Sequence, residues 1–92
     1  MIQSFADADT AELFRTERNC RFSSIARVSL RKLIQLNRAG CLGDLAVPPG
    51  NRLEALSGNR AGLHSIRIKA QWRILFRWSD SGPDDVAIVD CH

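Results

Sequence analysis

The residues best suited to chemistry lie between Arg60 and Trp78, in the run RAGLHSIRIKAQWRILFRW. This run holds no acidic residue and five cationic ones, namely Arg60, Arg67, Lys69, Arg73 and Arg77. Its apolar and polar residues alternate as in half-buried strands. The planar fork of arginine suits bidentate contact with phosphate. The pattern predicts binding of a phosphodiester backbone, with one arginine stabilising charge on a pentavalent phosphate. A solvated sheet face, paired with aspartates, is the alternative.

An acid–base pair ends the sequence, in the string DVAIVDCH. His92 would titrate near neutrality and could act as a general acid or base, with Asp90 raising its proton affinity. A disordered last residue is the alternative. Cys91 lies between them, but adjacent strand residues point to opposite faces. A Cys91–His92 dyad is therefore not expected, and Cys91 is interpreted as a small buried thiol.

Length and composition indicate one domain, residues 1–92, with a modest core. The net charge of +3 makes the chain mildly basic. Its three cysteines are widely spaced and form no CxxC pair, and they make no metal cluster with His64 and His92. We therefore expect neither a disulfide framework nor a metal or other cofactor. No segment approaches the roughly 20 apolar residues of a membrane span, and no signal peptide is evident. The expected location is cytoplasmic, with no membrane partner.

Two helices are predicted in the first half of the chain. Asp9 or Thr10 is a suitable N-cap for the first, which should end near Asn19. The second should cover 22–39, with Gly40 as its left-handed C′ residue. Its expected buried stripe consists of Phe22, Ala26, Leu30, Leu33 and Ile34. Its arginine-bearing face is either solvated or in contact with RNA or an acidic partner.

Strands are predicted to dominate the second half. Residues 41–51 should form an irregular loop, because Pro48, Pro49 and Gly50 disfavour regular structure. The expected strands are 52–56, 63–69, 72–78 and 86–91, with a further short strand at 1–5. Glycine-bounded residues 58–62 should form a turn. Helices followed by a meander of strands predict an α+β fold, with the helices packed on one face of the sheet.

Strand parity predicts which face carries the cations. The apolar residues Ile66, Ile68, Ile74 and Phe76 should face the helices, which places Arg67, Lys69, Arg73 and Arg77 on the opposite face. Trp72 and Trp78 share the apolar parity, which favours core packing over base stacking. Parity does not decide the orientation of the last strand. If Ala87 and Val89 face the helices, Asp90 and His92 join the arginines, and the opposite choice is equally apolar.

The strings RLEALSGNRAGLHSIRIKAQWRILFRW and DVAIVDCH resemble the HigB family. These proteins are killer toxins of plasmid maintenance systems, within the RelE/ParE superfamily. The most specific parts are the L-x-x-L-x-G-x-R-x-G turn, the QWRI-x-FRW strand and the terminal VD-x-H, and the resemblance covers essentially the whole chain. It implies two N-terminal helices packed on one face of a small, mainly antiparallel sheet.

The resemblance also implies an activity. HigB-like toxins are ribosome-dependent endonucleases that cut messenger RNA without a metal, because the RNA 2′-hydroxyl attacks its own phosphate. By resemblance Arg73 stabilises charge, His92 is the acid or base, and Asp90 supports it. The basic pattern assigns phosphate binding to Arg60, Arg67, Lys69 and Arg77, and the resemblance adds Ser57, at a position where the family binds phosphate. The implied partners are the ribosome, the mRNA and an antitoxin, usually with a helix-turn-helix domain.

Two positions depart from the family pattern. Ser57 stands where a lysine is usual, and Cys91 where a tyrosine is usual. Losing one stabilising group can lower a rate on the order of 10²–10³-fold, which predicts a slow nuclease. Two alternatives remain. One is an inhibitor of the ParE type, which poisons DNA gyrase by binding and does not need the terminal histidine. The other is an RNA-binding module with little or no nuclease activity.

Overall fold

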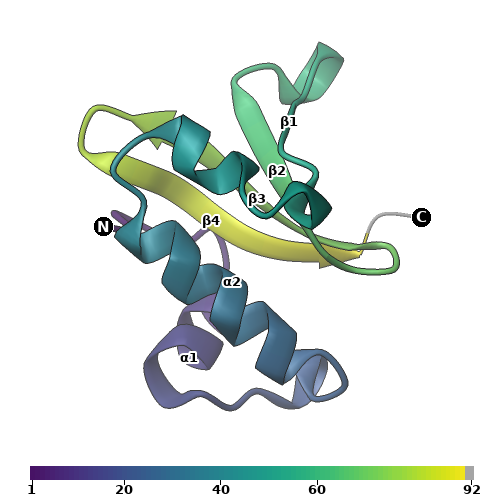
Figure 1. Ribbon diagram of the computed structural model, residues 1–92. Coiled ribbons are helices and arrows are strands. Elements are labelled where there is room, and N and C mark those ends of the chain that lie inside the picture. The colour runs from purple at the N-terminus through teal and green to yellow at the C-terminus, as the bar shows by residue number, and fades with distance from the viewer. Residues whose placement is uncertain (91–92) are drawn as a thin grey trace.

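The fold consists of two helices on one face of a four-stranded sheet (Figure 1). The computed structural model describes residues 1–90. The helices are α1 (Ala8–Thr16) and α2 (Ala26–Arg38). The strands are β1 (Glu54–Ala55), β2 (Leu63–Lys69), β3 (Trp72–Ser79) and β4 (Gly82–Asp90), joined in the order β1-β2-β3-β4 by antiparallel pairing. The predicted α+β architecture is confirmed.

Helix α1 begins earlier than the sequence suggested, because Asp7 is its N-cap. The Asp7 carboxylate accepts hydrogen bonds from the Thr10 backbone N–H at 2.7 Å and from its hydroxyl at 3.0 Å. The Thr10 hydroxyl oxygen in turn accepts from the backbone N–H of Ile88 at 3.1 Å. Thr10 is therefore a link to β4 and not a cap. The helix ends at Thr16, short of Asn19, where Glu17 adopts a left-handed conformation.

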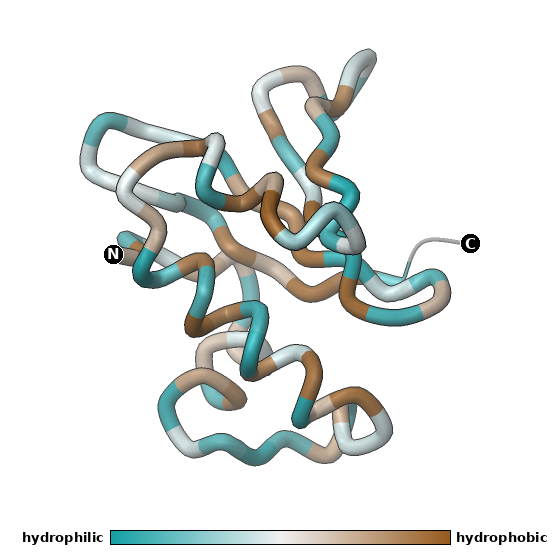
Figure 2. Tube along the Cα trace, viewed as in Figure 1, coloured by the Kyte–Doolittle hydropathy of each residue, from teal (hydrophilic) through white to brown (hydrophobic). Residues whose placement is uncertain are grey.

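Helix α2 begins at Ala26, and a separate 3₁₀ turn, Cys20–Phe22, precedes it. Its buried positions are Ser29, Leu33 and Leu36. Leu33 belonged to the predicted stripe, but Ile34 is 40% exposed and lies outside the core. Hydrophobic and hydrophilic residues alternate along the helix (Figure 2), so one face packs and the other meets solvent.

The chain leaves α2 without the predicted glycine cap. Ala39 is extended, with φ −64° and ψ 129°, and Gly40 does not have a positive φ. The carboxylate of Asp44 instead caps the start of the 3₁₀ turn that follows, Leu42–Ala46. It accepts from the N–H groups of Gly40 at 2.9 Å and Cys41 at 3.3 Å. These two hydrogen bonds, with a smaller contribution from the Cys41 side chain, lower the pKa of Asp44.

The segment between α2 and β1 is more regular than predicted, since it contains the 3₁₀ turns Leu42–Ala46 and Pro49–Asn51. The buried amide of Asn51 explains why. Its nitrogen donates to Gln35 Oε1 at 3.1 Å and to the Leu45 carbonyl at 3.0 Å, and its oxygen accepts from Lys32. Burial lowers the pKa of Lys32, as does Arg31 to a smaller extent. These bonds fix the segment to α2 just before β1 begins.

The N-terminal segment covers the outer edge of β4. Phe5 forms an isolated parallel bridge with Val86, and the expected strand at 1–5 is reduced to this bridge. The Val86 N–H donates to the Ser4 carbonyl at 3.0 Å, and the Ala6 N–H donates to the Val86 carbonyl at 2.8 Å. The edge strand therefore does not present these groups to other chains.

The core lies between the helices and the sheet. Its fully buried apolar residues are Leu13, Phe22, Leu33, Leu36, Leu45, Ile66, Ile74, Phe76, Val86 and Ile88. They come from α1 and α2, from the segments that join α1 to α2 and α2 to β1, and from strands β2, β3 and β4. The sheet is consequently anchored through one face, and its other face carries polar side chains together with Leu75 and Val89.

Neighbouring α2 residues should differ sharply in their contribution to stability. Leu33→Ala should lower the free energy of unfolding by about 2–5 kcal/mol, because it leaves a cavity in the core. Ile34→Ala is the matched control and should lower it by less than about 1 kcal/mol, because Ile34 is largely solvated. Urea unfolding followed by circular dichroism measures both. Equal losses of stability would contradict the placement of Leu33 on the buried face of α2 and of Ile34 on its solvated face.

The stability of the fold should depend on pH through the protonation of the Asp44 carboxylate. Its pKa is lowered in the folded state, so its stabilising effect is present above the unfolded value of about 3.9. That effect should disappear as the pH falls through the lower, folded-state pKa. Urea titrations between neutral and acid pH should show wild type more stable than Asp44→Asn at neutrality, with the gap closing in acid. A gap independent of pH would contradict the prediction.

Candidate functional site

Three arginines share the sheet face that points away from the helices. In the β2–β3 register Arg67 lies directly opposite Arg73, and Leu63 lies opposite Arg77. The alternate pair, Ile66 and Ile74, is fully buried on the helix side. Residues paired across an antiparallel ladder project to the same face. Arg67, Arg73 and Arg77 therefore form a row, which we call the arginine row.

Lys69 does not continue the arginine row as predicted. The β2–β3 register shifts between Arg67 and Lys69, so that Lys69 pairs with Trp72. Trp72 belongs to the helix-side parity and packs against the core. The extra residue in β2 precedes the tight turn at Ala70, which has a positive φ of 51°. A bulge of this kind changes which way later side chains point.

Arg73 is held in place by β1 and β2. Its Nη1 donates to the Ser65 hydroxyl at 3.2 Å and lies 3.8 Å from Glu54 Oε2. Glu54 and Ser65 are register partners, so the arginine side chain reaches diagonally across β2 towards β1. Ser65 is fully buried, and the Arg73 side chain is 25% exposed. The guanidinium is thus fixed through one nitrogen, and its Nε and Nη2 make no hydrogen bond within residues 1–90.

Arg77 has a different environment, further along β3. Its Nε lies 3.5 Å from Asp85 Oδ2, and both side chains are about half exposed. Gly62 faces it with a φ of +93°, and a Cβ there would lie 2.9 Å from Arg77 Nη1. Glycine therefore supplies both the backbone conformation and the space for the guanidinium. Four residues of strand place Arg77 roughly 13 Å from Arg73.

Ser57 and Arg60 lie in the connection between β1 and β2. The predicted turn there contains the short 3₁₀ helix Gly58–Arg60, whose Arg60 N–H donates to the Ser57 carbonyl at 3.3 Å. Both residues are exposed. This connection lies at the opposite end of β2 from the β2–β3 turn (Figure 1). Arg60 and Ser57 are thus nearer the Arg77 end of the arginine row than the Arg73 end.

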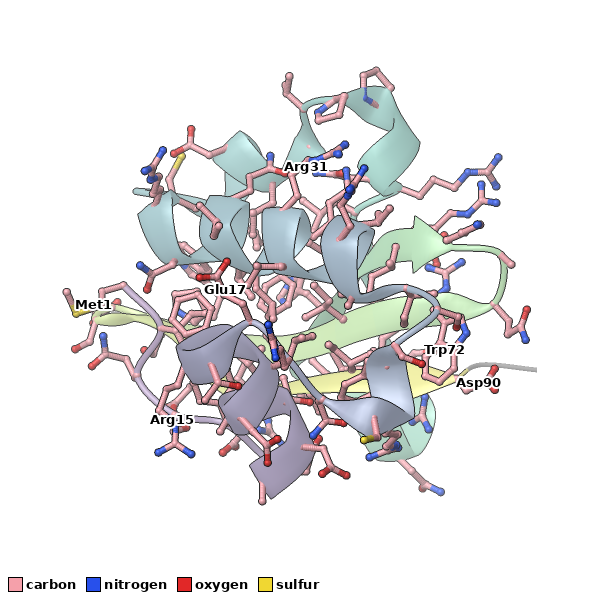
Figure 3. The ribbon with its side chains drawn as sticks, turned by 90° about the horizontal axis from the view of Figure 1, so that it is seen from below. Met1, Arg15, Glu17, Arg31, Trp72 and Asp90 are labelled. Carbon is pink, nitrogen blue, oxygen red and sulfur yellow. The ribbon has the colours of Figure 1, made fainter. Side chains whose placement is uncertain are left out.

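The orientation of the last strand, left open by the sequence, is decided by burial. Val86 and Ile88 are fully buried on the helix side, so Val89 shares the face of Arg73, its register partner. Asp90 pairs with Trp72 and has the helix-side parity. Figure 3 shows Asp90 beside Trp72 at the end of the sheet. Asp90 therefore does not join the arginine row, and Cys91 and His92 lie outside the described residues.

Both tryptophans pack against the core, as their parity predicted. Trp72 meets the ring of Phe22 edge-on, with 6.0 Å between ring centroids. Trp78 packs against the same cluster from the far end of β3. The two indoles hold the ends of the central strand, and their role in this structure is packing.

The sequence as a whole matches a known family. The model of the RelE-like toxin HigB, from type II toxin–antitoxin systems, matches residues 3–92. The chain belongs to the HigB-like toxin family. It is 39% identical to Toxin HigB-1 of Vibrio cholerae over 82 residues, covering 87% of this chain and 86% of that protein. It is also 30% identical to an uncharacterized protein of Haemophilus influenzae over 59 residues, covering 64% of this chain and 58% of the other. A HigB-like toxin has a cognate antitoxin as its partner.

The sequence did not predict that two further residues, Glu54 and Ser65, belong to the surroundings of Arg73. Both contact Arg73, and neither belongs to a recognisable motif on its own. Strand β1 is only two residues long, which is too short for alternation to reveal a face. The pairing of Glu54 with Ser65 is visible only in the register.

Neither a candidate metal-binding cluster nor a candidate membrane-spanning helix is found within residues 1–90 of this chain. Within residues 1–90 no group of three or more His, Cys, Asp or Glu side chains is placed to hold a metal ion. None of the helices described there is long and apolar enough to cross a membrane.

Two buried serines should respond differently to the loss of their hydroxyl groups. Ser65→Ala removes the acceptor of Arg73 and should lower the free energy of unfolding by about 0.5–1.5 kcal/mol. Ser29→Ala is the matched control, because its buried hydroxyl has no partner within residues 1–90 and its removal should be neutral or stabilising. Urea unfolding measures both. A loss at Ser29 as large as that at Ser65 would contradict the assigned contact.

Proposed function

We propose that this HigB-like toxin inhibits translation as a ribosome-dependent mRNA endonuclease. The observation that carries the proposal is the position of Arg73, on the central strand and on the face away from the helices. Ser65 and Glu54 engage one of its nitrogens, and within residues 1–90 its other two nitrogens make no hydrogen bond and can donate to a phosphate. A preorganised cation is the group needed to stabilise charge that develops on phosphorus.

In this proposal the cleaved phosphate binds at Arg73 and the RNA supplies its own nucleophile. The 2′-hydroxyl attacks the adjacent phosphorus, and Arg73 stabilises the added negative charge. His92 protonates the leaving 5′-oxygen, an assignment that comes from the family resemblance. Asp90, beside Trp72 at the end of β4, would support His92 from the helix side of the sheet and not from the arginine face.

The remaining cations are proposed to hold neighbouring phosphates. Arg67 lies opposite Arg73, and Arg77 lies further along β3. Arg60 and Ser57 extend this surface at the connection between β1 and β2, whereas the register shift before Lys69 removes that lysine from it. Such contacts add affinity without sequence selectivity and weaken as salt is raised. A serine at position 57 and a cysteine at position 91 support a slow enzyme, since each lacks the group usual in the family.

The proposed partners are the cytoplasmic ribosome with its mRNA and a cognate antitoxin with a helix-turn-helix domain. We expect the bound antitoxin to cover the arginine row or to distort the site around Arg73. A complex that leaves both exposed and undistorted would contradict direct blocking and favour exclusion of the toxin from the ribosome.

One observation favours the alternative of a non-enzymatic, ParE-like gyrase inhibitor. Asp90 has the helix-side parity and does not share the face of Arg73. An RNA-binding module with weak or no nuclease activity fits the same observation. Both alternatives require toxicity or RNA binding that persists without His92.

Replacing Arg73 by alanine or His92 by glutamine should abolish growth inhibition while the protein still folds. Each change removes a group that acts in the transition state, with an expected loss in cleavage rate on the order of 10²–10³-fold. Transcript cleavage sites mapped after brief expression provide the measurement. Arg15→Ala, an exposed change in α1, is the control and should remain toxic. Undiminished toxicity of both Arg73→Ala and His92→Gln would contradict the nuclease function and favour the inhibitor.

A further inference from the structure

We propose that Ser65 is a positioning residue for the cleavage reaction, because its buried hydroxyl directs the guanidinium of Arg73 towards the cleaved phosphate. The inference rests on the proposed nuclease function and adds to it a residue that touches neither the RNA nor the reacting atoms. Ser65 acts entirely through Arg73. Its loss would leave the positive charge in the site but without a fixed direction.

Ser65 lies in the middle of the open face of the sheet. It pairs with Glu54 of β1 on one side and with Leu75 of β3 on the other. Helices α1 and α2 lie on the other face (Figure 1), yet Ser65 is completely buried. Side chains of the sheet must therefore cover it, and Arg73 is the one that donates a hydrogen bond to its hydroxyl. The arginine thus reaches a small acceptor that is shielded from water.

The contact between Ser65 and Arg73 is directional. Arg73 Nη1 donates to the Ser65 hydroxyl oxygen at 3.2 Å. The carboxylate of Glu54 lies 3.8 Å from the same nitrogen, which is beyond hydrogen-bonding distance. An attraction between charges at that separation depends little on angle, whereas a hydrogen bond weakens steeply when it bends. Ser65 is therefore the more directional of the two contacts that hold this guanidinium.

The nitrogen bonded to Ser65 determines which edge of the guanidinium is presented to a ligand. The group is planar, and Nε and Nη2 lie side by side along one edge. Nη1, at the far corner, is the nitrogen that donates to Ser65. Within residues 1–90 the Nε–Nη2 edge of Arg73 makes no hydrogen bond. Two parallel donors on one edge match two oxygens of one phosphate.

A hydroxyl orients the arginine without neutralising it, because serine carries no charge. Arg77 has the other arrangement, since its Nε lies 3.5 Å from the carboxylate of Asp85. That carboxylate approaches the edge that would bind a phosphate, and it offsets part of the positive charge. Within the arginine row, as far as residues 1–90 show, Arg73 is the guanidinium that donates to a buried hydroxyl.

A fixed guanidinium should raise the rate of cleavage more than the affinity for RNA. A long side chain without an acceptor samples several rotamers, and a phosphate attracts the charge in most of them. Charge that develops on phosphorus instead requires donors already aimed at it. A misplacement of about 1 Å can cost on the order of 10²-fold in rate. Loss of Ser65 should therefore slow the chemical step and leave binding nearly unchanged.

The test follows single-turnover cleavage of one defined mRNA on purified ribosomes, with the toxin in excess. In Ser65→Ala the maximal rate should fall about 10–100-fold, while the toxin concentration that gives half of it should change less than about threefold. Ser65→Thr keeps the hydroxyl and should regain most of the rate. Ser29→Ala is the matched control, because it removes a buried hydroxyl in α2, and it should cleave at the wild-type rate.

A double-mutant cycle separates positioning from a general structural role. If Ser65 acts through Arg73, Ser65→Ala should have no further effect once residue 73 is alanine. Arg73→Ala and the double variant should therefore cleave within about twofold of each other. An equal loss of rate from Ser65→Ala in both backgrounds would show that the serine supports the fold in general, and it would overturn the positioning role.

Two further results would also overturn the assignment to Ser65. One is cleavage by Ser65→Ala at the wild-type rate. The other is a Ser65→Thr variant that is folded, as judged by circular dichroism melting, and cleaves as slowly as Ser65→Ala. Failure of wild type itself to cleave would overturn the nuclease function instead, so the two failures are distinguishable.

Discussion

The row of Ile66, Ile74 and Ile88 across the three long strands determines the orientation of the rest of the sheet. These residues are register neighbours and are completely buried against the helices. Side chains alternate between the two faces along a strand. Once one row is buried, the face of each neighbouring residue in these strands is therefore fixed. Arg67, Arg73 and Val89 lie on the open face for this reason alone. A slip of one residue would place arginines in the core, at a cost of several kcal/mol each.

The same register brings Arg67 and Arg73 directly opposite each other, an unfavourable arrangement for two cations. Glu54 offsets part of this repulsion at Arg73, and Ser65 fixes the direction of the guanidinium. The ion pair is partly exposed, so its contribution to stability is small. Its effect, together with that of the Ser65 hydrogen bond, is mainly on position, since the two contacts fix the direction of the guanidinium; under the proposed function, Arg73 is thereby oriented before a phosphate binds, which is the condition for effective electrostatic catalysis.

The sequence was a good guide wherever alternation was long enough to read. Strands β2 and β3 carry seven and eight residues, and their limits and faces were predicted nearly correctly. Prediction was wrong where a single contact decided the outcome. Thr10 looked like a cap but bonds to Ile88, Ile34 looked like core but faces solvent, and the bulge before Lys69 leaves no mark in the residue pattern. Glu54 stayed unnoticed because its relation to Arg73 exists only through two strand pairings.

The contacts that protect β4 join residues synthesised first to residues synthesised late. Ser4 bonds to Asp84 and Thr10 to Ile88, across 80 and 78 positions of sequence. These bonds of the N-terminal segment and of α1 therefore form only after β4 has been made. Until this last described strand has been added, the sheet that carries Arg73 is incomplete.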